Sequence, residues 1–107
     1  MKVNWTKQDM SKVLSDVKAC WEYLGIDESI RSIRFEQDSP HVALITVLEG
    51  YHVASWFRPT LVCGQWVVGE GILEGCMESE YREIGDLDEY LEDKKVLESR
   101  GYIYLEA

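Results

Sequence analysis

Residues 42–48 have the sequence VALITVL, and this seven-residue segment, Val42–Leu48, is the longest mainly apolar stretch of the chain. Successive side chains of a β-strand point to opposite faces of its sheet, so this stretch is apolar on both faces. A strand that is buried on both sides is typical of the centre of a sheet. We therefore expect a central strand here. Because a membrane-spanning helix needs about 20 apolar residues, the sequence predicts no membrane span.

The segment before this strand alternates between apolar and polar residues. Ile33 and Phe35 fall on one face, whereas Ser32 and Arg34 fall on the other. This period of two predicts a half-buried strand that begins near Ile30 and exposes its polar side.

Further β-rich runs follow the central strand. The first is Val53–Phe57, which ends at the pair Arg58-Pro59. The runs Leu61–Cys63 and Trp66–Val68 flank the dipeptide at positions 64–65, which is Gly-Gln. Glycine at the first of two central positions predicts a tight hairpin with a type II′ turn, and we expect the cysteine of this hairpin to be a core residue.

The first element of the chain has the pattern of an amphipathic helix over Lys7–Leu24. Thr6 is placed to cap its start together with Asp9, and Gly25 is placed to end it in a left-handed conformation. The apolar residues recur at helical spacing and form one stripe, made of Met10, Val13, Leu14, Val17, Trp21 and Leu24.

A second helix is predicted over Leu87–Arg100. Asp86 and Glu89 make a cap pair at its start, and Gly101 follows its end. A short closing strand over Tyr102–Leu105 comes next. The predicted apolar side of this helix consists of Leu87, Tyr90, Leu91 and Leu97.

These elements predict one compact α+β domain over residues 1–107. It has an N-terminal amphipathic helix, an antiparallel sheet of four to six strands, and a C-terminal helix followed by a short strand. We expect both helices to cover the same face of the sheet.

The net charge of the 107-residue chain is −9, and all of it comes from one segment. Residues 70–93 contain ten acidic residues and a single basic residue, Arg82, whereas acids and bases balance in the rest of the chain. A negative chain is a poor nonspecific ligand for nucleic acid or anionic membrane. Charge confined to one segment predicts a surface that orients encounters with a charged partner.

The conformation of residues 69–84 has two interpretations. A helix places Leu73, Cys76, Met77 and Ile84 on one face, although Gly75 weakens it, whereas a strand fits the alternation near residue 80. The spacing of four between Glu70, Glu74 and Glu78 places these three carboxylates on one face in either conformation. The sequence therefore predicts an acidic row in both cases.

Histidine and cysteine provide the candidate metal ligands His41, His52, Cys63 and Cys76. Consecutive members are eleven or more positions apart, whereas zinc sites usually contain close pairs, so we expect no metal site. Cys76 lies among carboxylates, which raise the pKa of a thiol, so we expect no cysteine nucleophile.

Together with Cys20 there are three cysteines without a Cys-x-x-Cys pair, and no apolar targeting segment opens the sequence. We expect free thiols and a cytoplasmic location.

No motif of the chain predicts catalysis or a cofactor. Gly69, Gly71 and Gly75 have a spacing one residue longer than that of a dinucleotide-binding loop, and Glu70 and Glu74 would repel a pyrophosphate. The carboxylates do not by themselves form the deep, fixed pair that a glycosidase needs. We therefore expect neither an enzyme nor a bound cofactor.

We expect a non-catalytic acidic binding or inhibitor protein that docks on a basic partner protein, such as a nuclease or a nucleic-acid-binding complex. A row of carboxylates can occupy the positions that phosphates take on such a partner, while aromatic side chains pack against it. Direct nucleic-acid and membrane partners are not expected. A phage or mobile-element anti-defence inhibitor and an immunity protein against a nuclease toxin both fit this hypothesis. The predicted contact residues are Glu70, Glu74, Glu78, Glu80, Tyr81, Glu83, Asp86, Asp88, Glu89, Tyr90, Glu92 and Asp93.

Two alternatives remain open. The high aromatic content and the two-faced strand Val42–Leu48 also fit a small structural or adaptor subunit, such as a homodimer, in which the acidic segment keeps the assembly soluble. A small enzyme or ligand binder would need a pocket, which Trp56, Trp66 and His52 could line.

Overall fold

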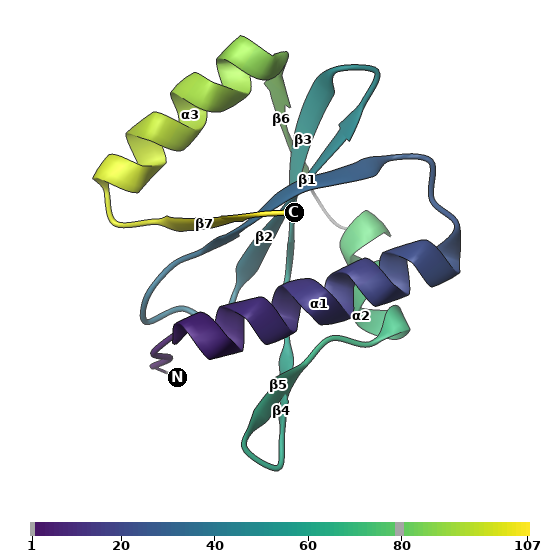
Figure 1. Cartoon of the computed structure of the whole chain (residues 1–107), viewed down its shortest axis with the longest axis vertical. Coiled ribbons are helices and arrows are strands. Elements are labelled where there is room, and N and C mark those ends of the chain that lie inside the picture. The colour runs from purple at the N-terminus through teal and green to yellow at the C-terminus, as the bar shows by residue number, and fades with distance from the viewer. Residues whose placement is uncertain (1, 79–80) are drawn as a thin grey trace.

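Strand β2 (Val42–Leu48) lies at the centre of a five-stranded antiparallel sheet, which confirms the prediction from its two apolar faces (Figure 1). The computed structural model describes residues 2–78 and 81–107. In spatial order the sheet is β6-β3-β2-β1-β7. The other bounds are α1 (Lys7–Leu24), β1 (Ser29–Phe35), β3 (Tyr51–Phe57), β4 (Thr60–Val62), β5 (Gln65–Val67), α2 (Glu70–Glu78), β6 (Tyr81–Gly85), α3 (Leu87–Ser99) and β7 (Ile103–Glu106). The fold is α+β, with the predicted helix at the start and the predicted helix and short strand at the end.

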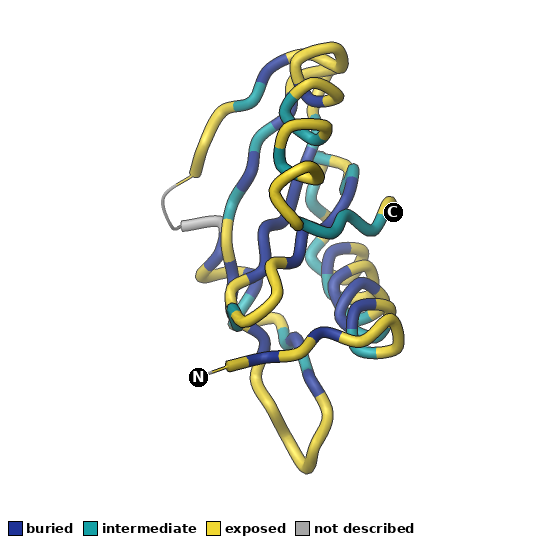
Figure 2. The backbone as a smooth tube through the Cα atoms, turned by 90° about the vertical axis from the view of Figure 1, so that its left-hand side faces the viewer, coloured by how far each residue is buried: buried dark blue, intermediate teal, exposed yellow. Residues whose placement is uncertain are grey.

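One face of the sheet, here the α1 face, carries the larger core. Val42 and Leu44 of β2 pack there with Val13 and Val17 of α1 and with Leu73 of α2. Figure 2 shows the result along α1, whose buried residues turn toward the sheet while exposed residues cover its outer side. The apolar stripe of α1 therefore faces the core, as its helical spacing predicts.

The opposite face of the sheet, here the α3 face, is covered by α3. Ala43 and Ile45 of β2 pack there with Ala54 of β3 and Tyr90 of α3. The expectation that both helices cover one face is wrong. A central strand that is apolar on both sides needs apolar cover on both sides, so the helices divide between the two faces.

The polar side of β1 is also buried, contrary to the expectation of a half-buried strand. Ser32 is completely buried and Arg34 is only 7% exposed. Both residues lie on the α3 face, where the Ser32 hydroxyl is 2.7 Å from the Tyr90 hydroxyl. The side chains that cover this face are themselves polar at their tips, so polar residues of the strand find partners there.

The two long helices begin where their sequences predict. The Thr6 hydroxyl accepts a hydrogen bond from the Asp9 amide, and the Asp9 carboxylate accepts one from the Thr6 amide. Gly25 then ends α1 with a φ of 65°. Asp86 and Glu89 form the same reciprocal arrangement at the start of α3. These caps satisfy amide donors that a helix cannot pair internally.

The β4–β5 hairpin projects from one end of the molecule (Figure 1). Its central residues are Cys63 and Gly64, with φ values of 49° and 79°, as in a type I′ turn, and Cys63 is exposed. The predicted turn at positions 64–65 and the predicted core cysteine are wrong. The register is set by Trp66, which is buried against Trp5 at 4.8 Å between ring centroids. A shift of one residue would turn Trp66 to solvent.

Replacement of Leu44 by alanine should lower the free energy of unfolding by about 2–5 kcal/mol, because it leaves a cavity under α1. Leu44 is fully buried, whereas Leu48 at the end of the same strand is 48% exposed. Leu48→Ala is therefore the matched control, and it should change stability by less than about 1 kcal/mol. Urea denaturation of the three proteins measures both effects. Equal losses in the two variants would contradict the central position of β2.

Candidate functional site

The ambiguous segment 69–84 forms both kinds of structure: helix α2 and then strand β6. Glu70 and Glu74 are exposed and lie four positions apart on α2, as the predicted acidic row requires, and Glu78 occupies its last position. Glu80, another predicted contact residue, lies outside the described residues. Helix α2 packs on the α1 face of the sheet, whereas α3 covers the other face. The predicted acidic surface over residues 70–93 is therefore divided into two parts.

The second part of the acidic segment lines an open groove of about 520 Å³ between β6 and α3. Five carboxylates line this acidic groove, namely Glu83, Asp88, Glu89, Glu92 and Asp93. They come from one strand and from successive turns of one helix, so tertiary packing adds Glu83 to a row that α3 supplies by itself. Arg82, Ile84 and Val96 complete the lining.

Several of these carboxylates also hold the local structure. Asp86 and Glu89 cap α3, as described above. Asp93 forms an ion pair of 2.7 Å with Arg82, the only base of the segment. In the described part of the chain, the side-chain carboxylates of Asp88 and Glu92 make no hydrogen bond or ion pair. These two carboxylates are thus available to an external cation.

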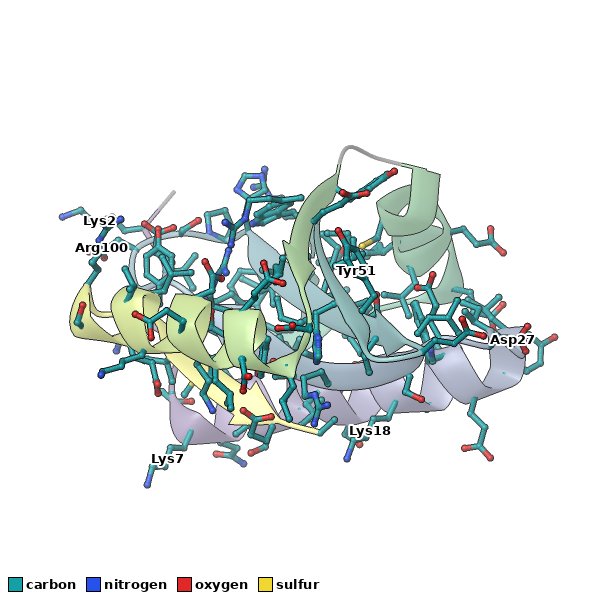
Figure 3. All side chains as sticks on the ribbon, turned by 90° about the horizontal axis from the view of Figure 1, so that it is seen from above. Lys2, Lys7, Lys18, Asp27, Tyr51 and Arg100 are labelled. Atoms are coloured by element: carbon teal, nitrogen blue, oxygen red, sulfur yellow. The ribbon has the colours of Figure 1, made fainter. Side chains whose placement is uncertain are left out.

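Apart from Arg82, no lysine or arginine among the described residues lines the groove. Lys7 and Lys18 point away from the sheet on the outer side of α1 (Figure 3). Lys94 of α3 is paired with the carboxylate of Glu106 on β7. The groove therefore keeps its negative charge even though α3 itself contains lysine.

The two predicted aromatic contact residues have opposite environments. Tyr81 is 62% exposed on β6, on the α1 face, where an external partner can reach it. Tyr90 is only 2% exposed, so the prediction that it packs against a partner is wrong. Its ring fills the space between α3 and the sheet, because α3 has no other large side chain that is fully buried.

Tyr90 is instead the centre of a buried polar cluster. Its hydroxyl bonds with Ser32 and also donates to Glu106 at 3.2 Å. Burial raises the pKa of Tyr90 strongly, and the hydrogen bond with Ser32 opposes this effect only in part. The hydroxyl therefore stays protonated and neutral at physiological pH. This cluster joins α3 to β1 and β7 and has a structural role.

His52 belongs to the same cluster. It is completely buried, and its ring stacks on that of Tyr90 with centroids 4.8 Å apart. One ring nitrogen, Nδ1, is 3.0 Å from the Gly85 carbonyl, and the other, Nε2, accepts a hydrogen bond from Arg31. Nδ1 must then carry the proton, so the imidazole is neutral. Both nitrogens are occupied, which removes His52 as a free base or ligand.

The pocket considered for Trp56, Trp66 and His52 does not form. Trp66 lies on the α1 face, whereas His52 packs with Tyr90 on the α3 face. Trp56 lies near Arg34 instead, with the guanidinium carbon 5.9 Å from its ring centroid. His52 and Trp56 share the α3 face of β3 but lie four positions apart along the strand, and Trp66 lies on the opposite face, so the three residues do not meet.

The cysteines lie in different environments. Burial raises the pKa of the Cys76 thiol, and this is a larger effect than the hydrogen bond to Ser55, which lowers it. The cause is burial, not the neighbouring carboxylates that the sequence suggested. Cys63 is exposed at the hairpin tip, away from Cys76 and His52. Among the residues that the structure describes, no cluster of histidine, cysteine and acidic side chains could hold a metal ion.

Sequence reasoning missed two apolar features of this region. Leu87 and Leu91, which were assigned to the buried side of α3, are about half exposed. Only Tyr90 of this helix is buried, so the helix packs on a narrow stripe. The available signal concerned Leu91 alone: it directly follows Tyr90 and therefore lies off the face of the helix on which Tyr90 and Asp93, three positions apart, both lie.

Replacement of Tyr90 by phenylalanine should lower the free energy of unfolding by about 1–3 kcal/mol, because it leaves the buried Ser32 hydroxyl without its partner. Tyr23→Phe is the matched control, since Tyr23 is exposed on α1 and its replacement should leave stability unchanged. Chemical denaturation checks both variants. An unchanged midpoint for Tyr90→Phe would argue against the structural role of this hydroxyl.

Comparisons of the chain with models of protein families, with curated proteins and with solved structures find no match. No helix in the described ranges, 2–78 and 81–107, is long and apolar enough to cross a membrane. The function therefore has to be inferred from the chemistry of the surfaces described above.

Proposed function

We propose that the protein is a non-catalytic binding protein that docks its acidic groove on a basic site of a partner protein. The observation that carries the proposal is the convergence of five carboxylates from β6 and α3 on one groove of about 520 Å³. Arg82 is the only base in its lining, and it is already paired with Asp93. Such a surface attracts cations over a distance and repels phosphates.

The groove also offers apolar contact beside its charge. Val96 lines the groove and is exposed, and Leu87 and Leu91 are exposed on α3 outside its lining. Stable protein interfaces combine a desolvated apolar centre with a polar rim. Exposed aliphatic side chains next to unpaired carboxylates support a protein partner over a small ion.

The geometry of the charge supports one class of partner. Asp88 and Glu92 lie one helical turn apart, and Glu83 stands across the groove from them. Proteins that bind a nucleic-acid backbone present arrays of lysine and arginine to successive phosphates. An array of carboxylates can occupy such a basic site and exclude nucleic acid from it. We therefore propose a nuclease or another nucleic-acid-handling protein as the partner, in an anti-defence or immunity role.

The proposed setting is the cytoplasm. Cys20 and Cys63 are free thiols, and Cys63 is exposed. Exposed free thiols are typical of reducing compartments. The nuclease-based systems that such an inhibitor or immunity protein would control also act there.

Reversal of charge at Asp88 and Glu92, in a double Asp88→Lys/Glu92→Lys variant, should slow association with the basic partner about tenfold or more, because these carboxylates steer the encounter. The partner is first isolated from nuclease-treated lysate at low salt and released at high salt. Stopped-flow or surface-based kinetics on the isolated partner then measure the association rate.

The matched control is Glu22→Lys/Asp27→Lys, which makes the same change of net charge at exposed positions outside the groove. Equal slowing in both variants would show that only net charge matters and would sink the assignment of the groove. Duplex DNA in excess should also compete with the protein for the partner. If excess DNA does not reduce binding of the protein to the partner, the carboxylates do not occupy the nucleic-acid site of that partner, and the proposal is refuted.

A second candidate function is that of a homodimeric structural subunit, which the projecting β4–β5 hairpin favours. Leu61 and Val62 near its tip are 50% and 49% exposed, and the hairpin carries no charge from Thr60 to Val68. Two strongly acidic copies repel each other, so an uncharged apolar surface is one through which they can associate. Light scattering should then show a dimer that Leu61→Ser/Val62→Thr converts to a monomer. A monomer for the unmodified protein would exclude this function.

A further inference from the structure

A second cavity lies on the other side of β6 from the acidic groove. Its volume is about 430 Å³, and it is bounded by the end of α1, by α2, and by β2, β3 and β6 on the α1 face of the sheet. Glu83 lines both this α2 cavity and the acidic groove. The volume is within the range of pockets that hold small organic ligands.

The charged groups that line the α2 cavity are all negative. Glu28 lies in the loop before β1, and Glu83 enters from β6. Neither carboxylate is paired with a lysine or arginine in the described part of the chain, and no basic residue among those described lines the cavity. Two carboxylates that share a partly enclosed space without a counter-ion favour the entry of a cation.

One of these carboxylates is held in place. The Tyr51 hydroxyl donates a hydrogen bond to Glu83 Oε2 at 3.1 Å, and this bond raises the pKa of Tyr51. Tyr51 stands in the space between β6 and α2 (Figure 3). The Glu83 carboxylate keeps further acceptor capacity, since each carboxylate can accept several hydrogen bonds.

Aromatic and apolar surface makes up much of the rest of the wall. Trp21 of α1, Tyr51 and Tyr81 contribute their rings, and Ile26 and Val53 add aliphatic surface. Aromatic faces attract ammonium and guanidinium groups, and apolar walls accept the carbon chain that carries them. Such a mixture fits an organic cation better than a hydrated metal ion.

A third feature of the α2 cavity is a polar group without a partner. Thr46 of β2 is 5% exposed, and it lines the cavity. Its hydroxyl has no hydrogen-bond partner among the residues described, and it is not sealed inside the protein. An unpaired hydroxyl on a nearly buried residue that lines a cavity is a potential donor or acceptor for a bound molecule.

We propose that the α2 cavity binds a small organic cation: an ammonium or guanidinium group on a short apolar chain. The cationic group lies between Glu28 and Glu83, its chain lies against Trp21 and Val53, and the Thr46 hydroxyl accepts one of its hydrogen bonds. The cation is either a free amine or the side chain of a lysine or arginine of a partner protein. The inference stands without the proposed docking of the acidic groove, because only Glu83 belongs to both sites.

Titration of the ¹⁵N-labelled protein with n-butylammonium and n-butylguanidinium tests the proposal. Amide signals of Thr46, Val53 and Ser55 should shift with saturation, whereas neutral n-pentanol and anionic butyrate should leave them unchanged. Glu28→Gln should weaken binding about tenfold, as expected for the loss of a charged hydrogen-bonding partner. The matched control is Glu22→Gln, which removes an equal charge from the exposed side of α1.

A capped Gly-Arg-Gly peptide distinguishes the two sources. Binding at least as tight as that of the free cation supports a side chain of a partner, and binding of the free cation alone supports a free amine. Equal weakening by Glu28→Gln and Glu22→Gln, or shifts spread over the whole surface, would overturn the proposal. The Asp88→Lys/Glu92→Lys variant should bind the cation normally. If the Asp88→Lys/Glu92→Lys variant binds the cation normally but no longer captures the partner, the result agrees both with this inference and with the proposed function.

Thr46→Val is a second variant of the same site, close in volume and without the hydroxyl. It should weaken cation binding while the dispersed amide spectrum shows an intact fold. Unchanged affinity in this variant together with unchanged affinity in Glu28→Gln would exclude the cavity as the binding site.

Discussion

The burial of β2 on both faces is the constraint on which the rest of the structure depends. Leu44 on one side and Ile45 on the other are both fully buried, so each face of the sheet needs its own cover. Helix α1 and the hydrophobic side of α2 supply it on one face, and α3 supplies it on the other. A chain of this length has little further material, so the second face is closed by the single helix α3 through one large side chain, Tyr90.

This division of the helices decides what the acidic segment can do. Residues 70–93 pass from α2 on the α1 face, through the edge strand β6, to α3 on the opposite face. Five carboxylates of this segment therefore border the acidic groove, and one of them, Glu83, also borders the α2 cavity. The groove is open, whereas the cavity is partly enclosed, with two carboxylates and aromatic rings. The fold thus divides a charge that is continuous along the chain between the two faces of the sheet, and it adds Glu28 from the loop before β1 to the α2 cavity.

The α3 face shows how polar residues can stand inside a small fold. Arg34 is nearly buried, and its guanidinium lies 5.3–5.9 Å from the ring centroids of Trp56, Tyr102 and Tyr104. It also donates a hydrogen bond to the Tyr104 hydroxyl. Aromatic faces and hydroxyls replace the water that this cation would otherwise need. The same solution applies to His52, which stacks on Tyr90, so the thin cover of this face is rich in directional contacts.

The sequence by itself determined the elements whose signals are local. The helix over Lys7–Leu24, both capping boxes and the central strand follow from periodicity and cap residues within a few positions of each other. Tertiary structure alone decided which face each helix covers, the register of the β4–β5 hairpin and the burial of Tyr90. It also brought Glu28, Thr46 and Glu83 to one cavity. These outcomes depend on contacts between residues far apart in the chain, and a side chain such as Tyr90 has the same local pattern whether a sheet or a partner covers it.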